Sequence, residues 1–172
     1  DSWKGCGIKV IPVVPSVALT KLVTRLGAAA VIAEGCESGG HVGELTTMSL
    51  VPQVCDATEL PVIAAGGIAD GRGVAAAFML GACGIQMGTR FLVANECSIH
   101  PNYKQKILNA SDISAIVTGK RLGHPVRGLK TPFTREYFKA EYSDISDEAL
   151  EAMGAGALRL AVQEGDLKRG CF

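Results

Sequence analysis

Short apolar runs alternate with amphipathic segments through the first half of the chain. The runs at 8–14, 30–34, 61–65 and 85–87 are rich in Val, Ile and Ala and are bounded by glycine or proline, which is typical of buried β-strands. Between these runs, apolar residues recur at the three- and four-residue spacing of an α-helix. Successive strand–helix units predict a parallel α/β sheet, which is either doubly wound or part of a (β/α)8 barrel.

Local signals mark where the intervening helices begin and end. Ser16 and Thr47 are expected to cap the first two helices, the second of which is predicted over 48–58, and Gly27 and Gly81 are expected to end the first and the third. The predicted inward positions are Leu19, Leu22, Val23 and Leu26 in the first helix, Leu50, Val51, Val54 and Cys55 in the second, and Val74, Ala75, Phe78 and Met79 in the third.

The hydrophobic pattern changes near residue 95. Downstream we predict a helix over 101–109, a short extended segment over 113–118, a loop over 122–130, and two or three amphipathic helices over 131–164. We therefore divide the chain into half of a barrel over 1–95 and a mostly helical cap or substrate-binding region, with the C-terminal helices, over 96–172.

Glycine turns decide between the two α/β folds. A dinucleotide-binding fold requires G-x-G-x-x-G after a strand and an acidic residue about 20 residues further on, and the turn at 66–71 has neither the spacing nor the acid. The turns Gly66–Gly67 and Gly88–Thr89 each follow a strand and open a helix, as in the phosphate site after the last two strands of a barrel. The alternative is that these glycines only permit tight turns. If the two turns form this phosphate site, the four predicted strands are the fifth to eighth of the barrel. We therefore expect the chain to be a fragment that lacks the first four strands.

A glycine-rich loop after the second strand carries His41. Its place at the carboxyl end of a strand suits a ligand-facing acid or base, although a structural histidine is the alternative. Glu34 could orient a ligand or pair with a neighbouring cation, and Gln86 could face a ring carbonyl or be inert filling.

Composition excludes several classes of function. The chain has 172 residues, 48% of them hydrophobic, so it is globular with a core to bury. Its 17 basic and 17 acidic residues balance, which argues against a nucleic-acid or anionic-membrane partner, and no apolar run approaches the length of a membrane span. The six cysteines include no C-x-x-C pair, which argues against a metal site and fits a reducing cytoplasm.

Three motifs of the first half resemble one enzyme superfamily. The runs V-I-A-E-G-C-E-S-G-G-H-V-G (31–43), P-V-I-A-A-G-G-I-A-D-G (61–71) and Q-M-G-T-R-F (86–91) resemble the FMN-binding (β/α)8 barrels that include nitronate monooxygenases and FabK-type enoyl-acyl-carrier-protein reductases. The runs H-P-N-Y-K (100–104), G-H-P-V-R (123–127) and M-G-A-G-A-L (153–158) are closer to the reductase branch.

The resemblance implies a flavin site, with the FMN phosphate on the two glycine turns, the ring near the end of the second strand, and His41 as the catalytic residue. The implied cofactor-binding residues are Glu34, Gly35, Gly39, Gly40, Ala65, Gly66, Gly67, Gln86, Met87, Gly88 and Thr89. NADH or NADPH would reduce the flavin, which would then reduce an enoyl thioester in fatty acid synthesis. A monovalent cation is also implied, for which no residue can be named.

The resemblance also implies partners and alternatives. The substrate would be a small molecule or an acyl group on an acyl carrier protein, and the full-length enzyme would be a cytoplasmic homodimer. Eight basic residues between 101 and 140 could steer the acidic carrier protein, or could simply be a solvated face. The first alternative is a nitronate monooxygenase that uses FMN and O2, in which the histidine is the base. The second is a non-catalytic remnant or binding module.

Overall fold

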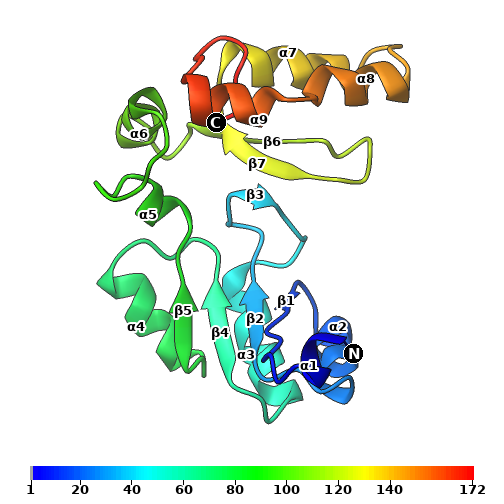
Figure 1. Ribbon diagram of the computed structural model, residues 1–172, viewed down its shortest axis with the longest axis vertical. Coiled ribbons are helices and arrows are strands. Elements are labelled where there is room, and N and C mark those ends of the chain that lie inside the picture. The colour runs from blue at the N-terminus through cyan, green and yellow to red at the C-terminus, as the bar shows by residue number, and fades with distance from the viewer. Residues whose placement is uncertain (1) are drawn as a thin grey trace. The chain divides into compact units, whose positions relative to one another are not determined.

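A computed structural model describes residues 2–172 and divides the chain into two compact units. Unit 1 comprises the described residues up to Ser38 together with Val42–Met87, and unit 2 comprises Gly39–His41 together with Gly88–Phe172. Figure 1 shows the order of their helices and strands.

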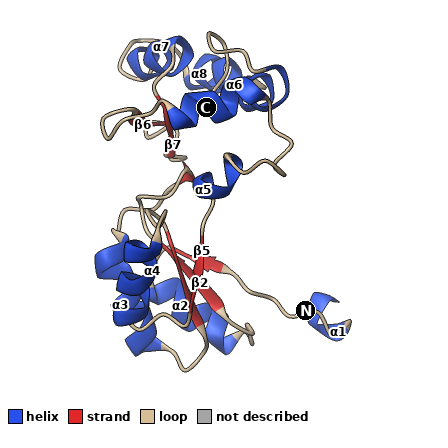
Figure 2. Cartoon of the chain, turned by 90° about the vertical axis from the view of Figure 1, so that its left-hand side faces the viewer, coloured by secondary structure: helices blue, strands red, loops and turns tan. Residues whose placement is uncertain are grey.

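Unit 1 is a parallel sheet covered by helices. Its elements are α1 (Ser2–Gly5), β1 (Val13–Val14), α2 (Val17–Arg25), β2 (Val31–Glu34), α3 (Thr47–Ala57), β4 (Val62–Ala65), α4 (Gly71–Met79) and β5 (Gly84–Gln86). The strands pair in the order β1-β2-β4-β5, all parallel. Because crossovers between parallel strands are right-handed, this sequential order puts α2, α3 and α4 on one face of the sheet, as Figure 2 shows. A doubly wound sheet would reverse its strand order, so the winding is that of a barrel.

The two faces of this sheet carry different rows of side chains. Val14, Ala33 and Ala64 are aligned in register, have 0% exposure, and form the core with α3 residues Leu50 and Val54. Because side chains alternate along a strand, the neighbouring registers lie on the opposite face. Those registers are the row Val13, Ile32, Ile63 and Gly84, and, at the carboxyl ends of the strands, the row Glu34, Ala65 and Gln86.

The predicted strands and helix ends of unit 1 are confirmed, except that the first strand is shorter than predicted and the cap of α3 lies one residue earlier. The first strand is only Val13–Val14 instead of 8–14, since Pro12 has no N–H to donate to a neighbouring strand. Ser16 caps α2 by accepting a hydrogen bond from Leu19 N at 3.2 Å, and Gly27 has the left-handed φ of +77° expected after a helix. The cap of α3 is Thr46, one residue earlier than predicted.

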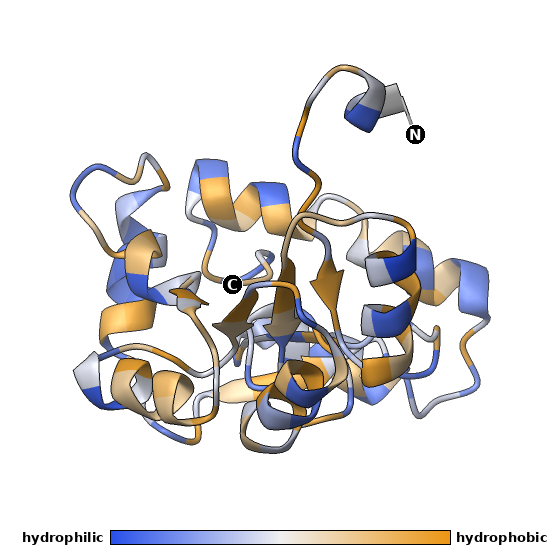
Figure 3. Ribbon diagram, turned by 90° about the horizontal axis from the view of Figure 1, so that it is seen from below, coloured by the Kyte–Doolittle hydropathy of each residue, from blue (hydrophilic) through white to orange (hydrophobic). Residues whose placement is uncertain are grey.

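Two predicted inner helix faces are wrong in part. Thr20 is fully buried in α2 while Leu22 is 43% exposed, because the Thr20 hydroxyl donates to Ser16 O at 2.9 Å and can therefore enter the core. In α4 the buried residue is Ala77, whereas Phe78 and Met79 are exposed. Both buried faces were predicted from hydrophobicity alone. The residues that pack most closely are instead a small residue, Ala77, and a residue whose hydroxyl is hydrogen-bonded to the N-cap of its own helix, Thr20. Figure 3 shows helices with hydrophilic and hydrophobic stretches, as expected of helices that pack on one side.

Unit 2 is a small antiparallel sheet with helices. Its elements are β3 (Gly40–His41), α5 (Thr89–Leu92), α6 (Pro101–Leu108), β6 (Ala115–Thr118), β7 (Val126–Leu129), α7 (Pro132–Ala140), α8 (Asp147–Gly154), α9 (Ala157–Arg159) and the π-helix η1 (Leu160–Glu164). The strands pair in the order β3-β7-β6. The core contains Tyr103, Ala161 and Phe172, and the rings of Tyr103 and Phe172 lie 4.8 Å apart.

The predictions for the second half are confirmed for the helices and wrong for one loop. The helix at 101–109 and the extended segment at 113–118 are present as α6 and β6. The predicted loop at 122–130 contains β7, which pairs with both β6 and β3. Its strand character comes from these partners, because Arg127 and Gly128 interrupt any apolar run. Within residues 2–172, every helix is too short or too polar to cross a membrane.

Candidate functional site

The carboxyl ends of three strands lie side by side in unit 1. Glu34 of β2 is in register with Ala65 of β4, and Ala65 is in register with Gln86 of β5. The turns that follow these strands therefore begin at one edge of the sheet, where parallel α/β folds bind their ligands. Of the predicted cofactor-binding residues, this edge brings together Glu34, Gly35, Ala65, Gly66, Gly67, Gln86 and Met87.

Gly35, Gly66 and the first residue of α3, Thr47, meet at this edge. The Gly35 N–H donates to Ala65 O at 3.0 Å, which joins the turn after β2 to the end of β4. A Cβ on Gly66 would lie 2.8 Å from both Gly35 O and Thr47 Oγ1, and a Cβ on Gly35 would collide with the Thr47 backbone. Glycine is needed at both positions because the three backbones approach too closely for a side chain.

The turn after β4 has a backbone suited to an anion. Gly66 and Gly67 have φ of +100° and +70°, a conformation that favours glycine. Within residues 2–172, neither N–H of this pair donates a hydrogen bond to a protein acceptor. Gly67 is exposed, so its N–H can reach a ligand. Unpaired backbone N–H groups ahead of a helix are the donors that phosphate groups use in α/β proteins.

Two side chains that sequence reasoning missed hold this turn. The Glu37 carboxylate accepts from Thr47 N at 2.9 and 3.1 Å and from Thr47 Oγ1 at 2.9 Å. Thr47 Oγ1 also lies 3.0 Å from Gly66 O and 3.3 Å from Ala65 O. The sequence offers no signal for this pair, because Glu37 lies ten residues before Thr47 and outside the positions that normally cap a helix.

A second polar pair lies at the end of β2. Burial raises the pKa of the Glu34 carboxyl above its usual value, and the nearby Ser38 hydroxyl lowers that pKa in part. Ser38 is 9% exposed, and within residues 2–172 its Oγ has no hydrogen-bond partner of standard geometry. A buried hydroxyl without a partner is unusual in a folded protein and points to a ligand at this edge.

The remaining predicted site residues belong to unit 2. Gly40 and His41 form β3, where His41 is in register with Val126, and His41 is exposed. Gly88 precedes the short helix α5, which begins at Thr89. A Cβ on Gly39 would lie 3.2 Å from Thr89 Oγ1, so the structure places Gly39 beside Thr89 within unit 2.

Several residues of the basic segment are engaged within unit 2. Lys104 Nζ donates to Ala94 O at 2.6 Å, and Lys130 Nζ donates to Ile113 O at 2.6 Å. The Arg121 guanidinium pairs with Asp147 at 2.8 Å and also donates to Ser143 O and Ile145 O. Of these contacts, the Arg121–Asp147 ion pair offsets a positive charge, whereas the two lysines keep theirs.

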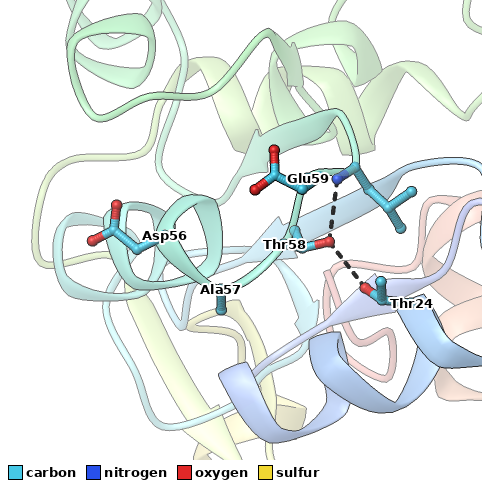
Figure 4. Close-up of a pocket in the computed structure, with 6 residues that line it drawn as sticks. Thr24, Asp56, Ala57, Thr58 and Glu59 are labelled. Atoms are coloured by element: carbon cyan, nitrogen blue, oxygen red, sulfur yellow. Dashed lines mark hydrogen bonds between the residues drawn. The ribbon is translucent and has the colours of Figure 1, made fainter.

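A depression of about 370 Å³ lies at the opposite edge of unit 1, lined by Thr24, Asp56, Ala57, Thr58, Glu59 and Leu60 (Figure 4). The Thr24 and Thr58 hydroxyls are 3.0 Å apart, and Leu60 N donates to Thr58 Oγ1 at 3.2 Å. The depression precedes β4, at the amino-terminal ends of the strands, where barrel residues serve stability instead of catalysis. We therefore assign the functional site to the glycine-turn edge.

Comparison with known proteins gives one family. The family model described as nitronate monooxygenase matches residues 1–172. The solved structure of FabK from Thermotoga maritima is 55% identical with a TM-score of 0.95, over 99% of this chain and 54% of that one. A probable nitronate monooxygenase of Staphylococcus saprophyticus is 40% identical over 88% of this chain and 46% of its own length.

A further relative is a carboxyl-CoA dehydrogenase of Rhodococcus jostii that acts on a hydroxy-methyl-oxo-octahydroindene skeleton. It is 44% identical over 74% of this chain and 36% of its own length. The chain thus spans about half the length, or less, of the relatives it matches. Together with the sequential strand order, the likeness to FabK confirms the predicted fold, which is the second half of a (β/α)8 barrel plus a mostly helical region.

Proposed function

The chain belongs to the nitronate monooxygenase family, and from this premise we propose that the full-length protein is an FMN-dependent enoyl-acyl-carrier-protein reductase that uses NADH or NADPH. The observation that carries the proposal is the 55% identity to FabK over 99% of the chain, against 40% to the nitronate monooxygenase of S. saprophyticus. The motifs of the second half, which resemble the reductase branch, lie within this matched region.

The names of the relatives support an acyl thioester as the substrate class. The R. jostii relative acts on a carboxyl-CoA, which is a thioester, and FabK-type reductases act on acyl thioesters of a carrier protein. Both relatives therefore act on substrates carried as thioesters. We propose an acyl carrier protein as the physiological carrier, and a cytoplasmic homodimer that uses a monovalent cation as the working form.

The glycine-turn edge fits a flavin phosphate. Gly66 and Gly67 would hold the phosphate through their unpaired N–H groups, and the assignment of Gly88 and Thr89 to the phosphate stays a prediction from the sequence. A bound flavin supplies hydride transfer, which no amino-acid side chain can perform. Glu34, from its place on the sheet face opposite the helices, is suited to hydrogen-bond the ligand. His41 would orient or protonate the substrate.

The proposal is tested by separating the two half-reactions of the full-length flavoenzyme without oxygen. NADH or NADPH should bleach the flavin absorbance, and crotonyl thioester on acyl carrier protein should then restore it with formation of one butyryl thioester per flavin. A flavin that stays reduced after addition of the enoyl thioester would refute the reductase assignment.

Nitronate monooxygenase is the second candidate, because the matching family model carries that description. In that reaction a base must remove a proton from a neutral nitroalkane, whereas a preformed nitronate needs none. Replacing His41→Ala should then slow turnover of the neutral nitroalkane roughly a hundredfold or more and largely spare the nitronate. Equal losses on both substrates would argue against His41 as a base.

A further inference from the structure

We infer that Glu37 and Thr47 form a latch that fixes the Gly66–Gly67 turn, and that both are positioning residues for a phosphate group bound there. The inference rests on the proposed FMN site and adds two side chains outside the predicted set. Neither residue would touch the flavin ring. Their role would be to hold the backbone that binds the phosphate.

Several hydrogen-bond acceptors crowd around the Thr47 hydroxyl. Thr47 Oγ1 lies 2.9 Å from a Glu37 carboxylate oxygen, 3.0 Å from Gly66 O and 3.3 Å from Ala65 O. A hydroxyl has one proton to donate, so these acceptors share it. The Thr47 side chain thereby ties the start of α3 to the last residue of β4 and the first residue of its turn.

The Glu37 side chain contacts both the start of α3 and the turn. Glu37 accepts the Thr47 N–H at the start of the eleven-residue helix α3, where a negative charge is stabilised by the helix dipole. A Cβ on Gly67 would lie 3.0 Å from Glu37 Cβ, so the Glu37 side chain is packed directly against the turn. The carboxylate therefore supplies the α3 N-terminus with an internal anion and leaves the Gly66 and Gly67 N–H groups for a ligand.

The Gly66–Gly67 turn must be held in place if it is to bind a phosphate tightly. A turn with two successive positive φ values is reached through glycines, which lose the most conformational freedom on ordering. Donors that are already held in place raise affinity, because binding then does not have to offset the entropy lost when the turn becomes ordered. Without the latch, binding of the phosphate would have to order the turn.

The experiment compares FMN with riboflavin, which lacks the phosphate, on the full-length apoprotein. The ratio of the riboflavin and FMN dissociation constants, measured by quenching of flavin fluorescence, isolates the phosphate contribution. Thr47→Val removes the hydroxyl at constant shape and should lower this ratio roughly tenfold, with riboflavin binding unchanged. Thr47→Ser keeps the hydroxyl and should keep the ratio within about twofold. Thr46→Val is the matched control, because the Thr46 hydroxyl lies 2.9 Å from Ser49 Oγ and, among the described residues, makes no hydrogen bond to the Gly66–Gly67 turn.

A double-mutant cycle tests whether the two residues act as a unit. In a Glu37→Gln background, Thr47→Val should lower the ratio by clearly less than in the wild type, because the latch is already weakened. Full additivity would overturn the latch. If valine disturbs the circular dichroism spectrum, Thr47→Ala takes its place and the same ratio decides.

Two outcomes separate the latch from the site it serves. If the wild type prefers FMN to riboflavin and Thr47→Val keeps the same preference, the latch alone is overturned. A wild-type protein that binds both flavins equally would overturn the proposed phosphate site, and the latch with it.

Discussion

Glu34 is the residue at the strand ends whose protonation depends most clearly on folding. Burial raises its pKa, so the folded state favours the neutral carboxyl more than the unfolded chain does. The folded state then binds more protons, and stability falls as pH rises from the unfolded pKa, about 4.3, through the higher folded pKa.

Replacing Glu34→Gln should remove this loss of stability. The variant should be more stable than the wild type near pH 8, and the difference should shrink as pH approaches about 4. Urea unfolding of both proteins across this range measures the effect. A difference independent of pH would show that Glu34 ionises equally well in the folded and unfolded chains.

Sequence reasoning at the residue scale found backbone positions better than side-chain partners. Gly66 and Gly67 follow from their place after an apolar run, and the structure confirms that both need positive φ. Glu37 and Thr47 were missed because their interaction joins segments separated by a loop, and no spacing rule specifies such a pair. The placement of the predicted flavin ligands around a cofactor stays a prediction.

At the scale of elements, α4 depends on its cap. Asp70 accepts from Arg72 N at 2.9 Å and pairs with the Arg72 guanidinium, and these hydrogen bonds lower the pKa of its carboxyl to about 2. Because the folded pKa lies below the unfolded value of about 3.9, the stabilisation is present above that value and is lost as pH falls toward 2.

The Asp70→Asn variant isolates this charge. Asparagine is also a good N-cap, so the helix should persist, but the ion pair with Arg72 is gone. The wild type should be the more stable protein at about pH 5, and the difference should vanish near pH 2. Asp166, whose pKa is also lowered to about 2, titrates in both proteins and cancels. A constant difference between the two unfolding midpoints would contradict the assignment.

The start of α7 shows how burial changes the value of a cap. Thr131 accepts from Thr134 N at 3.1 Å, donates to Gly170 O at 3.2 Å, and is 2% exposed. Ser146 caps α8 in the same way, through Ala149 N, on the exposed surface.

Thr131→Ala should cost about 2 kcal/mol of unfolding free energy or slightly more, because it also leaves the buried Gly170 carbonyl without its donor. Ser146→Ala, the matched exposed cap, should cost about 1 kcal/mol or less. Chemical denaturation of both variants measures the two costs. Equal costs would mean that burial of the cap contributes nothing.

Elements were predictable where their own residues dictate them. The strands of unit 1 are apolar and bounded by glycine, so their type follows from composition. β3 and β7 were missed because each becomes a strand only through its partners: His41 aligns with Val126 in β7, and Val126 aligns with Thr118 in β6. Pairing between segments that are distant in the sequence cannot be predicted from the residues of either segment alone.

At the scale of the whole molecule, each unit has its own core. Leu50 is fully buried in unit 1, and Phe172 packs against Tyr103 in unit 2, where its carbonyl accepts from Leu129 N at 2.5 Å. The two cores share no residue among those described.

Substitutions in one core should therefore act on that unit first. Phe172→Ala should cost about 3–5 kcal/mol and lower amide-exchange protection in α6 and β7, with β2 and β4 unaffected. Leu50→Ala should cost about 2–5 kcal/mol and produce the reverse pattern. Hydrogen exchange followed by mass spectrometry distinguishes the two. Equal loss of protection in both units for either variant would show that they unfold as one.

The barrel-type winding was predictable from the sequence, because the absence of a dinucleotide-binding turn excluded the competing fold and the observed order β1-β2-β4-β5 agrees. The identity of the substrate was not, since glycine turns of the kind predicted to hold a phosphate are shared by enzymes of different reaction classes.

The pairing of β3 with β7 also sets an order of events during synthesis. His41 emerges from the ribosome long before Val126, its partner in register, so β3 must wait for most of the chain before it has a neighbour. The apolar strands of unit 1 need only residues up to 87 and can pair earlier. During translation, the proposed catalytic histidine should therefore be among the last parts of the fold to acquire its final backbone conformation.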